Sequence, residues 1–174
     1  HHFRWIDRFI EEPLAVRIEQ TAPGGLKLRD ETKRSYPYGL IGKQILGFTN
    51  IDNKGQSGTE RSNDSLLAGR EGKADIRRDG LANLYRVKET ALVKPAPGQD
   101  IVLTIDWCLQ EILEEELRTG VEEFNASSGM ATFVDCRTGE VLAMAHYDPK
   151  EANPDKPFKL RAVSDQFEPG SIFK

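Results

Sequence analysis

A strand, a turn and a second strand are indicated by the sequence GMATFVDCRTGEVLAMAH, residues 129–146. On both sides of the turn-like tetrapeptide Cys136-Arg137-Thr138-Gly139, apolar residues dominate and are rich in β-formers. The pattern predicts strands over residues 129–135 and 140–146 that pair as an antiparallel hairpin.

The segment before the hairpin predicts a helix that covers it. Asp106 is a suitable N-cap, and apolar residues then recur on one helical face: Leu109, Ile112, Leu113, Leu117, Val121 and Phe124. We interpret the opposite, charged face as solvated rather than as a cation site: Glu111, Glu114, Glu115 and Arg118. The β-branched residues 101–105 predict a strand. A helix followed by a hairpin indicates an α+β arrangement, with the helix on one face of the sheet.

The chain upstream predicts short elements joined by turns. Helical spacing over residues 3–12 ends at Pro13, and alternation over residues 14–20 predicts a strand that a turn joins to an extended piece over residues 26–35. A short helix that leads into an extended exit is expected over residues 39–48, and a further helix over residues 59–68, with a loop between them and a hairpin over residues 72–88. Pro95, Pro97 and Gly98 indicate a linker, which divides the chain into domains 1–97 and 98–174.

Composition excludes several classes of function. The 174 residues carry a net charge of −4, and no basic stripe favours nucleic acid as a partner. No apolar run approaches the roughly 20 residues that span a bilayer, and no signal segment opens the chain. Any membrane anchor is therefore expected upstream.

The cysteines and histidines predict no metal or cofactor site. Cys108 and Cys136 show neither metal-ligand nor redox spacing, and we interpret them as small, partly buried residues, with a disulfide as the alternative. His1 and His2 open the chain, so a His-based metal site or Ser-His-Asp triad would have to use His146.

The nucleophile candidate is Ser171, with Lys174 three residues later. If a helix begins near Ser171, the hydroxyl and the amine lie one turn apart on the same face. Lys174 can accept the serine proton only when it is neutral, which requires a lowered pKa. A helix start also directs free backbone N–H groups toward the oxyanion formed on acylation. The tetrapeptide alone is weak support, because this spacing often arises by chance.

The context of the tetrapeptide is more specific. The sequence RAVSDQFEPGSIFK, residues 161–174, resembles the first active-site motif of class B penicillin-binding proteins. Five earlier segments resemble the same family in the same order: YPYG (36–39), LGFTN (46–50), GQSGTE (55–60), VLTID (102–106) and DCRTGEVLAM (135–144). The resemblance covers about residues 26–174, and its Glu-Pro-Gly-Ser form is more similar to the division-type branch than to the elongation-type branch.

This resemblance implies a fold and an activity. Residues 1–97 would form the elongated pedestal, also called the dimerisation domain, and residues 98–174 the start of the transpeptidase domain. The full-length protein would be a D,D-transpeptidase that joins peptidoglycan stem peptides and is acylated by β-lactams, with Ser171 as nucleophile and Lys174 as general base. It would lie at the extracytoplasmic face of the bacterial membrane, held by an N-terminal transmembrane helix.

The family also uses a Ser-x-Asn motif and a Lys-Thr-Gly-type strand, which this sequence lacks, so the chain alone is expected to be inactive. The alternative is a non-catalytic pedestal that docks cell-envelope proteins of the division or elongation machinery. A serine β-lactamase or β-lactam sensor shares the Ser-x-x-Lys pair but lacks the long pedestal. Glu60, Tyr36 and Tyr38 are expected to be structural, and Arg161 is expected to pair with a carboxylate or carbonyl near the active-site helix.

Overall fold

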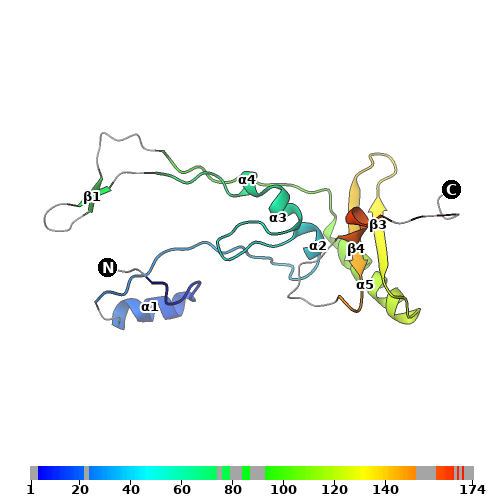
Figure 1. Ribbon diagram of the computed structural model, residues 1–174, viewed down its shortest axis with the longest axis horizontal. Helices are drawn as coiled ribbons and strands as arrows, with labels where there is room; N and C mark the ends of the chain where they lie inside the picture. Colours follow the sequence, from blue (N-terminus) through cyan, green and yellow to red (C-terminus); the bar gives the residue numbers. More distant parts are fainter. Residues whose placement is uncertain are drawn as a thin grey trace. The chain divides into compact units, whose positions relative to one another are not determined.

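The computed structural model describes these residues: 4–21, 24–73, 76–78, 84–86, 93–151, 160–166, 168 and 170. The chain forms two compact units, residues 1–35 and residues 36–174. Figure 1 shows the helices and strands in chain order. Across the described ranges, no helix has the length and apolar character needed to cross a membrane.

The first unit is built around α1 (Glu12–Thr21). The predictions of a helix over residues 3–12 and of a strand over residues 14–20 are wrong, because residues 4–11 are not helical and residues 14–20 are. Pro13 is the second residue of α1 and starts the helix instead of ending one. Proline is tolerated in a first helical turn, where its missing N–H would have no intrahelical acceptor.

An ion pair links the two ends of this unit. The Arg8 guanidinium donates to both carboxylate oxygens of Glu31, at 2.9 Å from Nε and 3.1 Å from Nη2. Arg8 also lies 5.3 Å from the ring centres of Trp5 and Phe9. Residues 26–35 are neither helix nor strand, so the prediction of a strand, a turn and a second strand in this region is wrong.

In the second unit, α2 (Lys43–Leu46) and α3 (Gly58–Ser62) meet backbone to backbone. Gly47 and Gly58 both have positive φ, and a Cβ on Gly47 would lie 1.9 Å from the Ser57 carbonyl oxygen. The helices predicted over residues 39–48 and 59–68 are present in shorter form. The second continues as α4 (Asp64–Leu67) after a break at Asn63.

A hairpin follows, as the sequence predicts. Strand β1 (Ile76–Arg78) pairs antiparallel with β2 (Leu84–Arg86), and the residues between the two strands, 79–83, lie outside the described residues. The chain runs back past α4, where Gly98 packs so closely that an added Cβ would lie 1.8 Å from the Leu67 carbonyl oxygen.

Helix α5 (Trp107–Glu123) begins where the sequence predicts. The Asp106 carboxylate accepts from the Leu109 backbone N–H at 3.0 Å, which satisfies one of the free donors of the first turn. The strand predicted over residues 101–105 is wrong: this segment has no ladder, and Val102 is 94% exposed. β-Branched residues favour strands only where a neighbouring strand is available to pack against.

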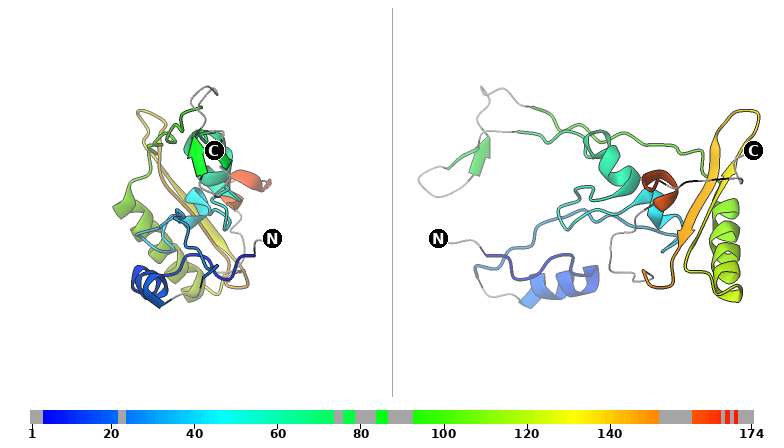
Figure 2. Two further views of the ribbon diagram at one scale, coloured as in Figure 1. Left: turned by 90° about the vertical axis from the view of Figure 1, so that its left-hand side faces the viewer. Right: turned by 45° about the vertical axis from the view of Figure 1, so that its right-hand side comes forward.

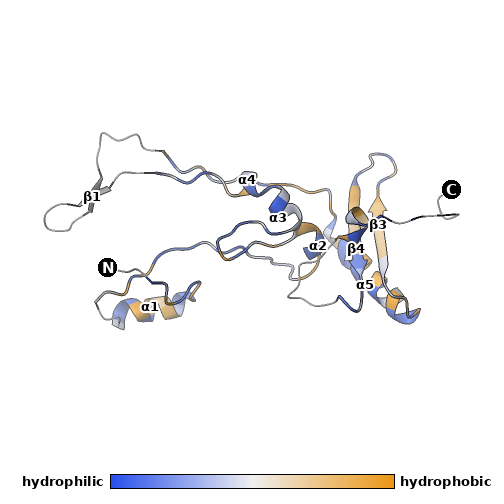
Figure 3. Ribbon diagram, in the orientation of Figure 1, coloured by the Kyte–Doolittle hydropathy of each residue, from blue (hydrophilic) through white to orange (hydrophobic). Residues whose placement is uncertain are grey.

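The hairpin of β3 (Gly129–Val134) and β4 (Val141–Tyr147) confirms the central prediction. The two strands are coloured mainly as hydrophobic in Figure 3. One face packs on α5, where the core contains Leu113, Ala143 and Ala145, with Leu109, Leu117 and Ala131 against it. Ile112 and Phe124, predicted on the buried face, are 55% and 79% exposed. The arrangement is α+β, as predicted, with α5 covering one face of the hairpin.

Both cysteines are free and exposed. The expectation of partial burial and the alternative of a disulfide are therefore both wrong. Cys108 lies in the first turn of α5, and Cys136 lies in the turn between β3 and β4.

Candidate active site

The predicted nucleophile and base, Ser171 and Lys174, lie outside the described residues, so their pairing stays a prediction. The structure describes the segment that leads to them: α6 (Arg161–Ser164), then residues 165, 166, 168 and 170. It also describes the hairpin on which α6 packs. Figure 2 shows α6 on one side of the hairpin and α5 on the other.

Arg161 is the charged centre of this approach segment. Its Nη2 lies 2.5 Å from Oε1 of Glu151 and 3.8 Å from Oδ2 of Asp148, both in the turn that follows β4. Its Nε lies 3.7 Å from Oδ2 of Asp165, just after α6. The predicted pairing of Arg161 with a carboxylate is confirmed. One guanidinium thus joins the exit of β4 to both ends of α6.

His146 lies beneath this cluster. It is only 6% exposed, and among the described residues its Nε2 has no hydrogen-bond partner. Burial lowers the pKa of His146, and the nearby Arg161 charge lowers it further, while Glu151, Asp148 and Asp165 act in the opposite direction. The imidazole is therefore biased toward its neutral form, which does not repel the guanidinium.

Two glutamine side chains close the outer edge of β4. Gln110 of α5 accepts from the Met144 N–H and donates to the Met144 carbonyl, both at 2.9 Å. Gln44 of α2 does the same for His146, accepting at 3.0 Å and donating at 2.6 Å. On alternate residues of an antiparallel strand, the backbone N–H and carbonyl point away from the partner strand. Each glutamine amide bonds to both of these groups on one residue of β4, as a further strand would.

A carboxylate supports this arrangement. Glu114 accepts from Gln110 Nε2 at 2.7 Å and from the Gly42 backbone N–H at 2.9 Å. It joins α5 to the residue preceding α2, so the interpretation of Glu114 as part of a solvated face is wrong. Gln44 and Gln110 were not identified as structural residues from the sequence. The available signal was the position of Gln110 on the apolar stripe of α5, three residues before Leu113, where a polar side chain needs a buried partner.

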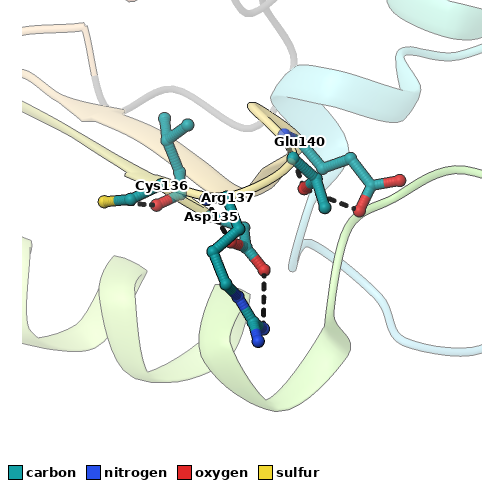
Figure 4. A network of polar contacts seen from close by, with 6 residues as sticks. Asp135, Cys136, Arg137 and Glu140 are labelled. Atoms are coloured by element: carbon teal, nitrogen blue, oxygen red, sulfur yellow. Dashed lines mark hydrogen bonds and ion pairs between the residues drawn. The ribbon is translucent and has the colours of Figure 1, made fainter.

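The turn between β3 and β4 is held by local hydrogen bonds, shown in Figure 4. The Asp135 carboxylate accepts from the Arg137 backbone N–H at 2.7 Å. This hydrogen bond is the main cause of the lowered pKa of Asp135, and the hydrogen bond from the Arg137 guanidinium is the second. The Asp135 carbonyl accepts from Gly139, whose φ of 78° suits glycine. These contacts explain the Asp-x-x-Thr-Gly-Glu pattern as a structural turn.

The remaining structural expectations hold in this unit. Glu60 is buried at 7% exposure, the Tyr36 hydroxyl accepts from the Thr49 N–H at 3.2 Å, and Tyr38 stacks on Trp107 with ring centres 4.0 Å apart. Within the described ranges, no three His, Cys, Asp or Glu side chains gather in a way that could hold a metal ion. The acidic residues near α6 surround Arg161 instead. The described residues thus tie α6, which precedes Ser171 in the sequence, to the turn that follows β4.

Two protein-family models match the chain, in order. The Penicillin-binding Protein dimerisation domain matches residues 6–103, and the penicillin binding protein transpeptidase domain matches residues 129–174. Ser171 and Lys174 fall inside the second match.

Curated relatives and solved structures agree with these matches. The chain is 35% identical to the probable peptidoglycan D,D-transpeptidase PenA of Neisseria gonorrhoeae and 34% identical to the peptidoglycan D,D-transpeptidase FtsI of Escherichia coli K12, over 99% of its own length in each case. It spans only 31% and 30% of those relatives. Penicillin binding protein 3 of Mycobacterium tuberculosis aligns with a TM-score of 0.63 at 32% identity, covering 80% of this chain and 29% of that one. The same protein has been crystallised with aztreonam.

Proposed function

The chain belongs to the penicillin-binding proteins, and from that premise we propose that the whole protein is a serine D,D-transpeptidase that cross-links peptidoglycan stem peptides. The observation that carries the proposal is the order of the two family matches, with the Ser171-x-x-Lys174 motif inside the transpeptidase match. The curated relatives, both D,D-transpeptidases by name, support it.

In the proposed reaction, the Ser171 hydroxyl attacks the carbonyl carbon of a D-Ala-D-Ala bond, and Lys174 accepts its proton. The terminal D-Ala leaves as the amine after it is protonated, and an ester joins Ser171 to the remaining stem peptide. An amine of a neighbouring stem peptide then displaces Ser171 and completes the cross-link. A β-lactam would acylate the same hydroxyl. In support of β-lactam binding, the M. tuberculosis relative has been crystallised in complex with aztreonam.

A labelled penicillin tests the assignment of the nucleophile. The full-length wild-type protein should become covalently labelled, and Ser171→Ala should abolish the label. Ser62→Ala is the matched control, because Ser62 is an exposed serine of α3 whose hydroxyl has local partners: it donates to the Gly58 and Thr59 carbonyls and accepts from the side chain of the next residue, Asn63. Persistent labelling of the Ser171→Ala protein would contradict the proposal, as would a wild-type protein that takes up no label.

Location and branch are part of the same proposal. Because its substrate is peptidoglycan, the protein acts at the extracytoplasmic face of the membrane, held by a transmembrane helix upstream of residue 1. The Glu-Pro-Gly-Ser motif and the segment LGFTN (46–50) favour the division-type branch. The boundary between pedestal and transpeptidase domain is proposed at residues 97 and 98.

The match to the dimerisation domain favours a second role for the pedestal, the docking of other cell-envelope proteins. Docking does not require the nucleophile. The full-length Ser171→Ala protein should therefore still accumulate at the division site when it is fluorescently tagged. Dispersal of this variant over the whole envelope would contradict the docking role.

A further inference from the structure

Arg161 connects parts of the chain that lie on both sides of α6. On one side, Asp148 and Glu151 belong to the turn that leaves β4, whose backbone is closed by a 3.0 Å bond from the Glu151 N–H to the Asp148 carbonyl. On the other side, Asp165 follows α6 directly and lies six residues before Ser171. The guanidinium is therefore the link between the hairpin and the entry to the segment that carries the proposed nucleophile.

The cluster is enclosed enough for its charges to matter. The Arg161 side chain is 28% exposed, and the side chains of its carboxylate partners range from 13% exposed at Asp148 to 54% at Glu151. Arg137 offers a contrast, since its side chain is 89% exposed and its guanidinium pairs with Asp135, at 3.4 Å, and with no other carboxylate in the described part of the chain. A solvent-exposed pair of that kind contributes little, whereas a partly buried arginine among three carboxylates is screened far less.

The β4 strand, which leads into the turn that Arg161 contacts, is itself held in place by hydrogen bonds. Gln44 and Gln110 hold the edge of β4 at His146 and Met144, the residues just before the turn that contains Asp148. The Arg161 cluster then transfers that fixed position to α6. The contacts of α6 with the hairpin are few, because the helix has only four residues and its Val163 is 70% exposed. Apolar packing alone therefore orients this helix weakly.

We propose that Arg161 is a positioning residue for the acylation step, which fixes the chain that enters the Ser171 segment so that the nucleophile is correctly placed. This inference rests on the proposed transpeptidase function. A misplacement of about 1 Å at a reacting group can lower a rate by about a hundredfold. Removal of Arg161 should therefore slow acylation more than it reduces the amount of folded protein.

The test uses the full-length protein and a labelled penicillin, with two quantities measured separately. The first is the fraction of molecules labelled at long times, which reports how much protein is folded and competent. The second is the rate constant of acylation, separated from non-covalent affinity by varying the penicillin concentration. A purely structural role for Arg161 would lower the labelled fraction and leave the rate of the labelled molecules unchanged.

Arg161→Met is expected to lower the acylation rate constant about tenfold or more, with a nearly complete labelled fraction. Arg161→Lys should recover part of the rate, because a lysine keeps the charge but cannot engage the carboxylates as a planar fork. Arg137→Met is the matched control and should react at the wild-type rate. If Arg161→Met does not fold, Asp165→Asn decides the question, because it removes the contact nearest to Ser171 in the chain and should also slow acylation.

A wild-type acylation rate in folded Arg161→Met, or in Asp165→Asn when the first variant does not fold, would overturn the positioning role. The proposed function would stand in that case, provided that Ser171→Ala remains unlabelled. A wild-type protein without any label would instead overturn the proposed function, and the positioning role with it.

Discussion

Replacing Gln110 by methionine should loosen the outer edge of β4. Gln110 is 1% exposed, and its amide pairs with both backbone groups of Met144 at 2.9 Å. Methionine has nearly the same length and volume, so the change removes three hydrogen bonds, two with Met144 and one with Glu114, without opening a large cavity. The partly buried Met144 N–H and carbonyl then lose these partners.

The magnitude follows from those two groups. Each buried donor or acceptor left without a partner costs about 1–3 kcal/mol, and the more apolar methionine offsets roughly 1 kcal/mol of the total. Glu114 keeps the Gly42 N–H as a donor, so its carboxylate adds little to the loss. We expect the local stability of β4 to fall by about 3 kcal/mol.

Hydrogen–deuterium exchange of the peptide that covers residues 141–147 measures this change directly. A loss of about 3 kcal/mol corresponds to roughly hundredfold faster exchange at the Met144 amide. Gln56→Met is the control, because Gln56 is exposed and its amide bonds only to the neighbouring residues 54 and 55. Exchange of β4 within about threefold of the wild-type rate would refute the role assigned to the Gln110 amide.

Two further predictions concern stability. Because burial and Arg161 lower the pKa of His146 below its ordinary 6.5, the unfolded chain binds the proton more readily. The wild-type melting temperature should therefore fall as pH drops through about 6.5, and His146→Gln should lose less on the same acidification; equal losses would contradict this. Gly98→Ala should unfold at a lower temperature than the wild type, because the added Cβ would overlap the Leu67 carbonyl oxygen. Gly120→Ala should instead be stabilised by about 0.5–1 kcal/mol, because Gly120 lies in α5 with open space around it. Calorimetry that ranks these two variants in the opposite order would refute the reasoning.

Sequence reasoning succeeded where local signals were unambiguous. The Asp106 cap, the apolar stripe of α5 and the strand-turn-strand pattern of β3 and β4 each depend on residues close together in the chain. Local rules failed where one residue allowed two outcomes. Pro13 can end a helix or occupy the first turn of one, and here it lies at the start of α1.

The candidate site divides in the same way. The sequence motif names Ser171 and Lys174, and the pairing of Arg161 with carboxylates could be predicted from its charge beside the active-site motif. Which carboxylates Arg161 meets could not be predicted, because Asp148 and Glu151 lie in the turn that follows β4, whereas Asp165 lies just after α6. Which carboxylates lie next to an arginine depends on how the folded chain brings separate segments together, and the composition of the sequence does not specify that.

The sequence by itself determined the family, the order of the two matched domains and the α+β character of the second, because motifs and periodicity are properties of neighbouring residues. Tertiary structure alone decided the pairing of the β4 edge. Gln110 is 34 residues from Met144, and Gln44 is 102 residues from His146, yet each amide replaces a missing strand. The sequence alone identifies a glutamine only as a polar residue. It becomes a structural residue when the fold places it beside a strand edge that has no neighbouring strand, because the backbone groups of that edge require hydrogen-bond partners.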